Sequence, residues 1–357
     1  MSSKFVLHIA KIAFYLHNES LWHIFFKNYC NFASMRSKRI KKILLWCLGV
    51  TALLAIIALV VSSFYMLNFA LEPMRRSHQE AMERFYKREP ESLKVWVDSL
   101  EKNKVLRDTS INVEGRGKLT ALYINGDSAS NHVAVLLHGY NDRAESMLHI
   151  AYIYNHEMGF NVLLPHFFGH GDSDGDHIDM GWKDRLDVMQ WMQVANDMFK
   201  GDSTQSQMVV HGISMGGATT MCISGEECPA YVKCFVEDCG YTSVWDEFSG
   251  ELKNQFGLPS FPLMNITSTL CKMRYGWTFG EASSLEQVKK STLPMLFIHG
   301  DADTFVPYAM LDRLYNAKTM GYKEKYIAHG TEHARAYTDH PEEYTQRVKN
   351  FVNRFIK

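Results

Sequence analysis

The stretch Gly-Ile-Ser-Met-Gly at 212–216 constrains this chain most, because it places Ser214 between two glycines. A short apolar run at 207–211 precedes it, and a helix-forming run follows from Ala218. On a sharp turn between a strand and a helix, the serine backbone is strained and neighbouring side chains would clash with it. The sequence therefore predicts a strand–turn–helix unit with Ser214 on the sharp turn, the usual place for a nucleophilic serine.

Apolar, strand-like runs recur along the chain, and a segment with helical periodicity follows each of them. The runs are 132–137, 160–164, 208–210, 234–236 and 295–298. Such alternation predicts a mostly parallel central sheet flanked by helices. Chemically active residues of these sheets gather at the carboxyl ends of the strands.

Residues 243–290 interrupt the alternation. This segment is long, rich in aromatic residues and methionine, and shows little strand periodicity. We interpret it as a helical insertion that acts as a lid over the sheet. The alternative is a pair of ordinary surface helices with buried aromatic side chains.

Ser214 needs a base that accepts its proton and a carboxylate that orients the base. Asp303 lies in an acidic turn after the run at 295–298, and it is the predicted acid. Asp238 ends the preceding apolar run and is the alternative acid, whereas Asp301 is expected to shape the turn.

The sequence contains 16 histidines, so the choice of the base depends on position. His333 lies in a loop before the last helix and gives the chain order serine, acid, histidine that is found on α/β-hydrolase sheets. His329 and His340 fit that loop less well. The predicted catalytic residues are therefore Ser214, Asp303 and His333.

A tetrahedral intermediate on Ser214 would need donors for its oxyanion, and backbone amides at strand ends can supply them. The run that ends at Leu137 is followed by Gly139, which lets the backbone approach a substrate. We expect the amides of Tyr140 and Met215 to form the oxyanion hole. His138 is expected to support this loop.

Histidines and aspartates crowd residues 166–177, and the spacing of Asp172, Asp174 and Asp176 faintly resembles a calcium loop. The glycine is misplaced and the closing glutamate is missing. We interpret the loop as a hydrogen-bonded turn, and the sequence predicts no metal site and no cofactor.

Residues 43–67 carry no charge and are long enough to cross a bilayer as one helix. Five lysines and arginines lie at 36–42, against Arg75 and Arg76 beyond the far end. The positive-inside rule then predicts a single-pass membrane protein with a cytoplasmic N-terminus and an extracytoplasmic catalytic domain. A buried core helix and a cleavable signal peptide are the alternatives, but no clear Ala-x-Ala site follows the run.

These features divide the chain into four parts. Residues 1–34 are an N-terminal extension, and Met35 is an alternative start; 35–70 form the basic flank and signal anchor. Residues 71–104 are a helical connector that Pro90 divides into two helices, and 105–357 form the main domain with its insertion. A net charge of −1 gives no electrostatic basis for binding nucleic acid.

From about residue 105 the chain resembles the α/β-hydrolase superfamily, and it looks most like membrane-anchored bacterial serine hydrolases of the esterase, lysophospholipase and serine aminopeptidase types. Five motifs in family order carry the resemblance, at 136–140, 169–175, 212–217, 299–307 and 332–334. The resemblance implies the fold and the Ser-His-Asp triad, and it leaves the substrate open.

The sequence thus predicts a membrane-anchored serine hydrolase that cleaves carboxylic esters through an acyl-enzyme, with a small-molecule acyl ester as substrate and the lipid bilayer as partner through 43–67. The apolar insertion favours an ester with an apolar group. Peptide or amide hydrolysis is the alternative, with Glu237 or Asp246 as a partner for a free amine. A non-catalytic surface binding protein is the third hypothesis.

Overall fold

The computed structural model describes residues 38–127, 130–202 and 205–357, which form two compact units. The larger unit, here called the hydrolase unit, consists of Leu71–Glu247 and Gly280–Lys357. The smaller one, here called the helical unit, consists of the described residues up to Ala70 together with Phe248–Phe279. The predicted extension at 1–34 lies outside the described residues.

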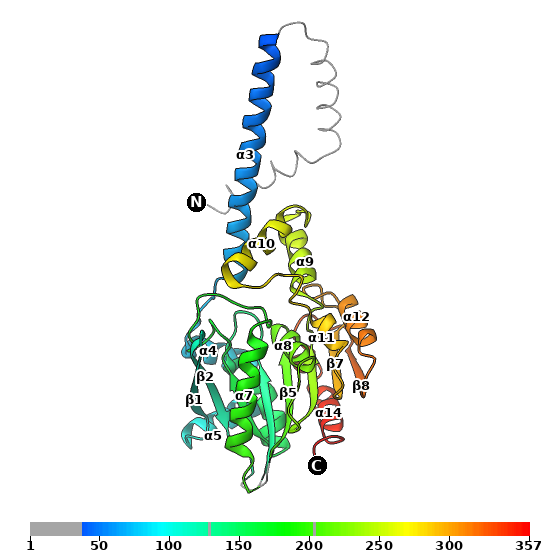
Figure 1. The fold of residues 1–357 in the computed structure, drawn as a ribbon. Helices are drawn as coiled ribbons and strands as arrows, with labels where there is room; N and C mark the ends of the chain where they lie inside the picture. The colour runs from blue at the N-terminus through cyan, green and yellow to red at the C-terminus, as the bar shows by residue number, and fades with distance from the viewer. Residues whose placement is uncertain (1–37, 128–129, 203–204) are drawn as a thin grey trace. The chain divides into compact units, whose positions relative to one another are not determined.

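A single eight-stranded sheet forms the centre of the hydrolase unit, in the order β1-β2-β4-β3-β5-β6-β7-β8 (Figure 1). The strands are β1 Arg107–Val113, β2 Gly117–Ile124, β3 His132–Leu137, β4 Asn161–Pro165, β5 Gln207–Ile213, β6 Val232–Asp238, β7 Met295–Gly300 and β8 Lys323–Ala328. β1 pairs antiparallel with β2, as does β2 with β4, and every other pair is parallel. The predicted mostly parallel sheet is confirmed.

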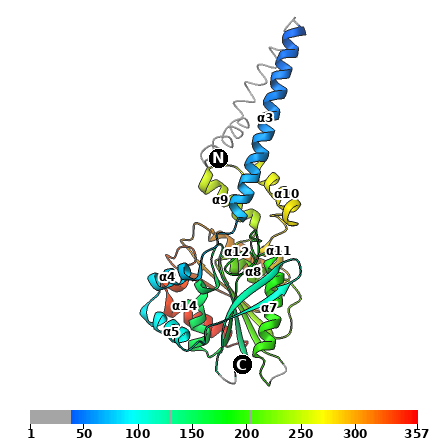
Figure 2. The same cartoon turned by 90° about the vertical axis from the view of Figure 1, so that its left-hand side faces the viewer.

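The central strands are mostly apolar because helices cover both faces of the sheet. β4 and β7 are buried over their whole length, and β3 and β5 over all but their first residue. The helices of the hydrolase unit are α4 His78–Arg88, α5 Glu91–Lys102, α6 Leu148–Ala151, α7 Asp184–Phe199, α8 Met215–Ser224, α11 Ser284–Val288, α12 Ala309–Ala317, α13 Ala336–Asp339 and α14 Pro341–Val352, with short η1 Ala144–Met147 and η2 Tyr152–Glu157. Helices α4, α5 and α14 lie on one side of the sheet, and α7 and α8 lie on the other (Figure 2).

The segment at 71–104 forms two helices, α4 and α5, which Pro90 separates. The first begins with a capping box, in which Ser77 Oγ accepts from the Glu80 amide at 3.2 Å and Glu80 Oε2 accepts from the Ser77 amide at 2.7 Å. Phe85 and Trp96 are buried in the same core as the sheet residues. This segment is thus an integral part of the hydrolase unit.

The helical unit contains the long helix α3, Lys38–Leu71, except its last residue, and the part of α9, Val244–Phe256, from Phe248 onward. It also contains the whole of α10, Leu263–Tyr275. The helix over Ile40–Leu71 is long and apolar enough to cross a membrane, and its most apolar part is not buried inside the protein. Of the helices within 243–290, α11 packs on α8 in the hydrolase unit, where Cys222 Sγ lies 3.7 Å from Ser284 Oγ.

Candidate active site

Ser214 lies at the turn between β5 and α8 with a backbone φ of 58° and ψ of −117°. This conformation is strained for any residue except glycine, and its neighbours must leave room for it. A Cβ atom on Gly216 would overlap the carbonyl oxygen of Leu137, and one on Gly212 would overlap the carbonyl oxygen of Gly216. The two glycines are therefore required by close backbone packing, as the sequence predicts.

The structure brings Ser214, His333 and Asp303 together at the carboxyl ends of β5 and β7. Ser214 Oγ lies 2.9 Å from His333 Nε2, and His333 Nδ1 lies 2.7 Å from Asp303 Oδ2. Since a carboxylate only accepts hydrogen bonds, Nδ1 carries the ring proton and leaves Nε2 free to accept from the serine hydroxyl. These three residues therefore have the geometry of a nucleophile, a base and an orienting acid.

Asp303 is held in its ionised form by donors on both of its oxygens. Its Oδ1 accepts from the amides of Phe305 and Val306, both at 2.9 Å, and its Oδ2 accepts from His333 Nδ1. Its Oδ2 also lies 3.3 Å from His299 Nε2, which donates to the Val306 carbonyl oxygen at 2.9 Å as well. Burial alone would raise the pKa of Asp303, but hydrogen bonds from His299 and His333 outweigh burial and lower the pKa below its ordinary value. An ionised carboxylate therefore faces the His333 ring.

The other candidate carboxylates are engaged elsewhere. Asp238 Oδ2 accepts from the Tyr344 hydroxyl at 2.9 Å, and burial raises the pKa of Asp238 to about 6. Asp301 accepts from the Gly330 amide at 2.6 Å and pairs with His329 at 2.8 Å, so it holds the turn together. Neither carboxylate hydrogen-bonds to His333.

The remaining candidate histidines have backbone partners or lie in solvent. The side chain of His329 is 81% exposed. His340 Nε2 donates to the backbone carbonyl oxygen of His329 at 3.0 Å. His138 is fully buried, donates from Nδ1 to the Gly139 carbonyl at 2.8 Å and accepts at Nε2 from the Phe167 amide at 3.3 Å. Burial lowers the pKa of His138 to about 3, so this neutral ring ties two loops together.

The loop after β3 runs beside the nucleophile. A Cβ atom on Gly139 would lie 3.6 Å from Ser214 Cβ, in ordinary contact. Met215 follows Ser214 directly as the first residue of α8, so its amide belongs to the unpaired first turn of that helix. Tyr140 follows Gly139 in the chain and Met215 follows Ser214, and their role as oxyanion donors stays a prediction.

The crowded loop at 166–177 is held by hydrogen bonds to the rest of the hydrolase unit. Arg143, 2% exposed, donates to Asp172 at 2.8 Å and to Glu145 at 3.0 Å, and His166 Nε2 lies 3.2 Å from Glu145. Asp174 accepts from the Lys118 amide at 2.7 Å. These contacts explain the density of charged residues by the anchoring of the loop.

Two neighbours of the triad are absent from the sequence-based predictions. His299 is the second imidazole on Asp303, and its position at the end of β7, four residues before that aspartate, was the available signal. Cys239 places its sulfur within 4.8 Å of the ligand atoms of Asp303 and His333. Burial raises the pKa of the Cys239 thiol well above its ordinary value, so the sulfur remains protonated and packs as a small apolar group.

The two carboxylates considered for binding an amine have other partners. Glu237 is fully buried, accepts from the Gly240 amide at 3.1 Å, and has its pKa raised by burial to about 8. Asp246 accepts from Thr242 at 2.6 Å and pairs with Arg313 at 2.9 Å.

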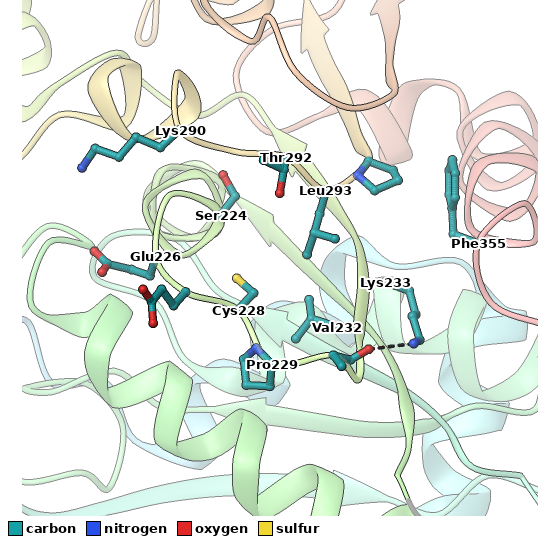
Figure 3. Close-up of a pocket in the computed structure, with 13 residues that line it drawn as sticks. Ser224, Glu226, Cys228, Pro229, Val232, Lys233, Lys290, Thr292, Leu293 and Phe355 are labelled. Atoms are coloured by element: carbon teal, nitrogen blue, oxygen red, sulfur yellow. Dashed lines mark hydrogen bonds between the residues drawn. The ribbon is translucent and has the colours of Figure 1, made fainter.

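A pocket of about 690 Å³ lies beside the starts of β6 and β7 (Figure 3). Ser214 lies at the other end of the sheet, after the carboxyl end of β5. The walls of the pocket include Ser224 at the end of α8, Val232 at the start of β6, and Leu293 just before β7. Cys228 and the side chains of Glu226 and Lys290 also line it. No predicted catalytic residue lines this pocket.

Comparisons with known proteins agree with this geometry. The sequence profile of the prolyl oligopeptidase family matches residues 146–357, which is more than half of the chain. The Bacillus subtilis protein YqkD is 30% identical over 198 residues, covering 55% of this chain and 63% of YqkD. The match therefore spans less than two thirds of that relative.

Solved structures share the fold. An esterase from Pyrococcus furiosus is 24% identical with a TM-score of 0.58, covering 71% of this chain and 92% of the esterase. A puromycin-hydrolyzing peptidase from Mycobacterium tuberculosis is 18% identical with a TM-score of 0.55, covering 70% of this chain and 39% of the peptidase. The predicted α/β-hydrolase fold is confirmed, and both ester- and amide-cleaving enzymes are built on it.

Proposed function

This chain belongs to the prolyl oligopeptidase family, and we propose that it is a membrane-anchored serine hydrolase that cleaves carboxylic esters through an acyl-enzyme. Serine-hydrolase activity in general is supported by the family and by the esterase and the peptidase that share the fold. We further propose that the bond cleaved is an ester, that α3 anchors the protein in a membrane, and that Ser214, His333 and Asp303 act as nucleophile, base and acid.

The hydrogen-bonded chain from Ser214 through His333 to Asp303 carries the proposal, with its two links of 2.9 and 2.7 Å. In the first half-reaction, His333 Nε2 takes the Ser214 proton while Oγ attacks the acyl carbonyl. The amides of Tyr140 and Met215 stabilise the oxyanion. His333 then gives its proton to the departing alcohol, which leaves an ester of Ser214.

In the second half-reaction, His333 takes a proton from water, and the resulting hydroxide attacks the acyl-enzyme. Collapse of the intermediate returns the proton to Ser214 Oγ and releases the carboxylic acid. Asp303 stabilises the imidazolium in both halves, because hydrogen bonds keep its pKa low and its charge in place.

An ester is favoured over a peptide by the polar groups around the site. A peptidase that binds a free amino terminus needs an accessible carboxylate, whereas Glu237 is buried and Asp246 is paired with Arg313. The insertion instead exposes large apolar side chains, among them Phe261 and Met273. Peptide or amide hydrolysis remains the second candidate, favoured by the family to which the chain belongs.

The anchor is proposed from α3. Its uncharged part, residues 43–71, follows the basic segment at 36–42, and few basic residues follow its far end. This charge asymmetry supports a cytoplasmic N-terminus and an extracytoplasmic hydrolase unit.

The test is labelling of the full-length protein in detergent with a fluorophosphonate probe, which reacts only with an activated serine. We expect the unsubstituted protein to be labelled, Ser214→Ala to abolish labelling, and Ser224→Ala to preserve it. Ser224 is a suitable control because it is also buried on α8 and only donates to the Met221 carbonyl. Labelling that survives Ser214→Ala refutes the triad, and no labelling at all favours the non-catalytic binding protein.

A substrate panel separates the two hydrolase hypotheses. The values of kcat/KM for acyl esters of increasing chain length are compared with those for aminoacyl and prolyl amides. We expect the esters to be preferred by at least about 100-fold, because alkoxide leaves an acyl centre more readily than amide nitrogen does. A preference for the amides would replace the ester proposal by the peptidase one.

A further inference from the structure

Helix α3 is longer than a membrane requires. Its candidate membrane span, Ile40–Leu71, has 32 residues, which extend over about 48 Å at 1.5 Å per residue, against about 30 Å for the hydrocarbon core. A tilt of about 20° shortens this projection by only about 3 Å. Some ten residues of the helix therefore lie outside the hydrocarbon.

The basic flank determines which end protrudes. Lys41 and Lys42 precede the uncharged stretch, and charged side chains are held at the cytoplasmic interface. Roughly 20 residues then cross the hydrocarbon, which brings the chain to about Ser62. The last two turns of α3, Phe64–Leu71, reach the level of the outer lipid headgroups.

The insertion is attached to this protruding end within the helical unit. Phe256, the last residue of α9, packs edge-to-face on Phe69 with ring centroids 5.8 Å apart. Arg274 near the end of α10 donates to Asn68 Oδ1 at 2.9 Å. Because both contacts fall on the protruding turns, an anchored α3 would place residues 248–279 at headgroup level.

This attached insertion presents apolar side chains outward. Phe261, between α9 and α10, is 61% exposed, and Met273 on α10 is 79% exposed. Large apolar side chains in water are unfavourable by about 1.5–3 kcal/mol each relative to burial. The segment also carries three basic residues, Lys253, Lys272 and Arg274, against the single acidic residue Glu251.

We propose that residues 248–279 form a membrane-interface element, in which Phe261 and Met273 enter an anionic phospholipid surface and the enzyme takes acyl esters from that surface. The combination of exposed apolar and basic side chains is the one that binds at the boundary of headgroups and acyl chains. Continuity with α3 selects the bilayer as the occupant. This inference rests on the proposed membrane anchor and names the substrate class of the same site.

Photo-crosslinking of the full-length protein in nanodiscs with 30% anionic lipid tests the contact, with about one protein per disc. The photoreactive residue p-benzoylphenylalanine replaces Phe261, Met273 or, as a control, Tyr322 of the hydrolase unit, which is 42% exposed. We expect lipid adducts at 261 and 273, at least about fivefold above those at 322. Equal adducts at all three positions, or crosslinks to a second copy or to the same chain instead of lipid, overturn the proposal.

Turnover tests the consequence. In Phe261→Asp/Met273→Asp, hydrolysis of a long-chain ester carried in anionic vesicles is expected to fall about tenfold or more, while hydrolysis of a soluble short-chain ester stays unchanged. The control Met320→Asp alters a methionine of the hydrolase unit that is 45% exposed, and it should leave both rates unchanged. An unchanged ratio of the two rates in the double variant overturns the inference.

The proposed function fails separately from this inference. If the unsubstituted protein does not hydrolyse soluble esters, the esterase function is refuted. If alkaline carbonate releases the protein from membranes, the membrane anchor is refuted. With both intact, the two experiments above report on the interface element alone.

Discussion

The turn at Ser214 and the helical unit differ in how closely their residues are packed and in how much of each side chain is exposed. Ser214 is 8% exposed, and its flanking glycines are packed so closely that a single added carbon would overlap backbone atoms. In the helical unit, a Cβ atom added to Gly49 or Gly250 would meet open space, and Phe261 is 61% exposed.

The two regions differ in packing: at the turn the side chains are enclosed by other parts of the chain, whereas the helical unit leaves large apolar side chains exposed. At the turn, all three triad groups already have partners at hydrogen-bonding distance, so substitution there should affect chemistry or folding. In the helical unit, Phe261 and Met273 are 61% and 79% exposed, and a lipid surface is the partner proposed for them. Substitutions there should affect association with lipid and leave the fold nearly unchanged.

The largest expected effect is on the acid of the triad. Asp303→Asn should lower kcat by about 10⁴-fold, because an amide neither selects the required tautomer of His333 nor stabilises its imidazolium. Asp238→Asn, at the other strand end, should lower kcat by less than about tenfold, since Asp238 bonds to Tyr344 and not to His333. Steady-state kinetics with a soluble ester measure both, and equal losses would contradict the assignment of Asp303.

The next effect contrasts two glycines. Gly216→Ala should destabilise the hydrolase unit by about 3 kcal/mol, because the methyl group meets the fixed carbonyl oxygen of Leu137. This corresponds to a fall in Tm of about 6–12 °C. Gly250→Ala, in open space on α9, should instead stabilise its helix by about 0.5–1 kcal/mol. Thermal unfolding in detergent checks both, and a stable Gly216→Ala would mean that the turn has more room than its backbone shows.

The geometry of the Ser214 turn was predictable because its causes are local. A buried strand, two glycines and a helix within about ten residues leave the serine few conformations, and the order of strands and helices implies a parallel sheet. The ends of β5 and β6 then lie side by side, with Ile213 paired to Asp238. These features need no knowledge of distant contacts.

Other features depend on contacts far apart in the sequence. Asp238 and Asp303 both follow strands, and they differ because the Tyr344 hydroxyl, 106 residues after Asp238, donates to its carboxylate. His299 likewise becomes a partner of Asp303 only through the conformation of the turn between them. Within the predicted insertion at 243–290, composition does not distinguish α11, which packs on α8, from α10 in the helical unit.

A smaller effect is expected from the second imidazole on Asp303. His299→Phe removes one hydrogen bond that lowers the pKa of Asp303, so this pKa should rise. Because the folded-state pKa is depressed, the ionised carboxylate stabilises the fold above the unfolded pKa of about 3.9, and this stabilisation is lost as pH falls through the folded pKa. In the variant, the stabilisation by ionised Asp303 should therefore be lost at a higher pH than in the unsubstituted protein.

In catalysis, His299→Phe should lower kcat/KM by about tenfold or more at pH 8, because one hydrogen bond to a charged group contributes about 1.5–3 kcal/mol, and by a larger factor at pH 5. His329→Phe is the matched control, since His329 also pairs with an aspartate, Asp301, but is 81% exposed. Its pH–rate profile should match that of the unsubstituted protein. A uniform loss for His299→Phe at all pH values would indicate a purely structural role.

The smallest effect is expected at the attachment of the insertion to α3. Phe69→Ala removes the edge-to-face contact with Phe256, worth about 0.5–1.5 kcal/mol, and leaves the bond from Arg274 to Asn68 in place. Amide hydrogen exchange over 248–279 should therefore accelerate by about two- to tenfold, because local opening becomes less costly by that free energy. Exchange over 207–224, around Ser214, should not change, since that segment is stabilised by contacts within the hydrolase unit. If exchange accelerates equally in both segments, the two units unfold as one, and the contrast between the enclosed turn and the exposed helical unit is lost.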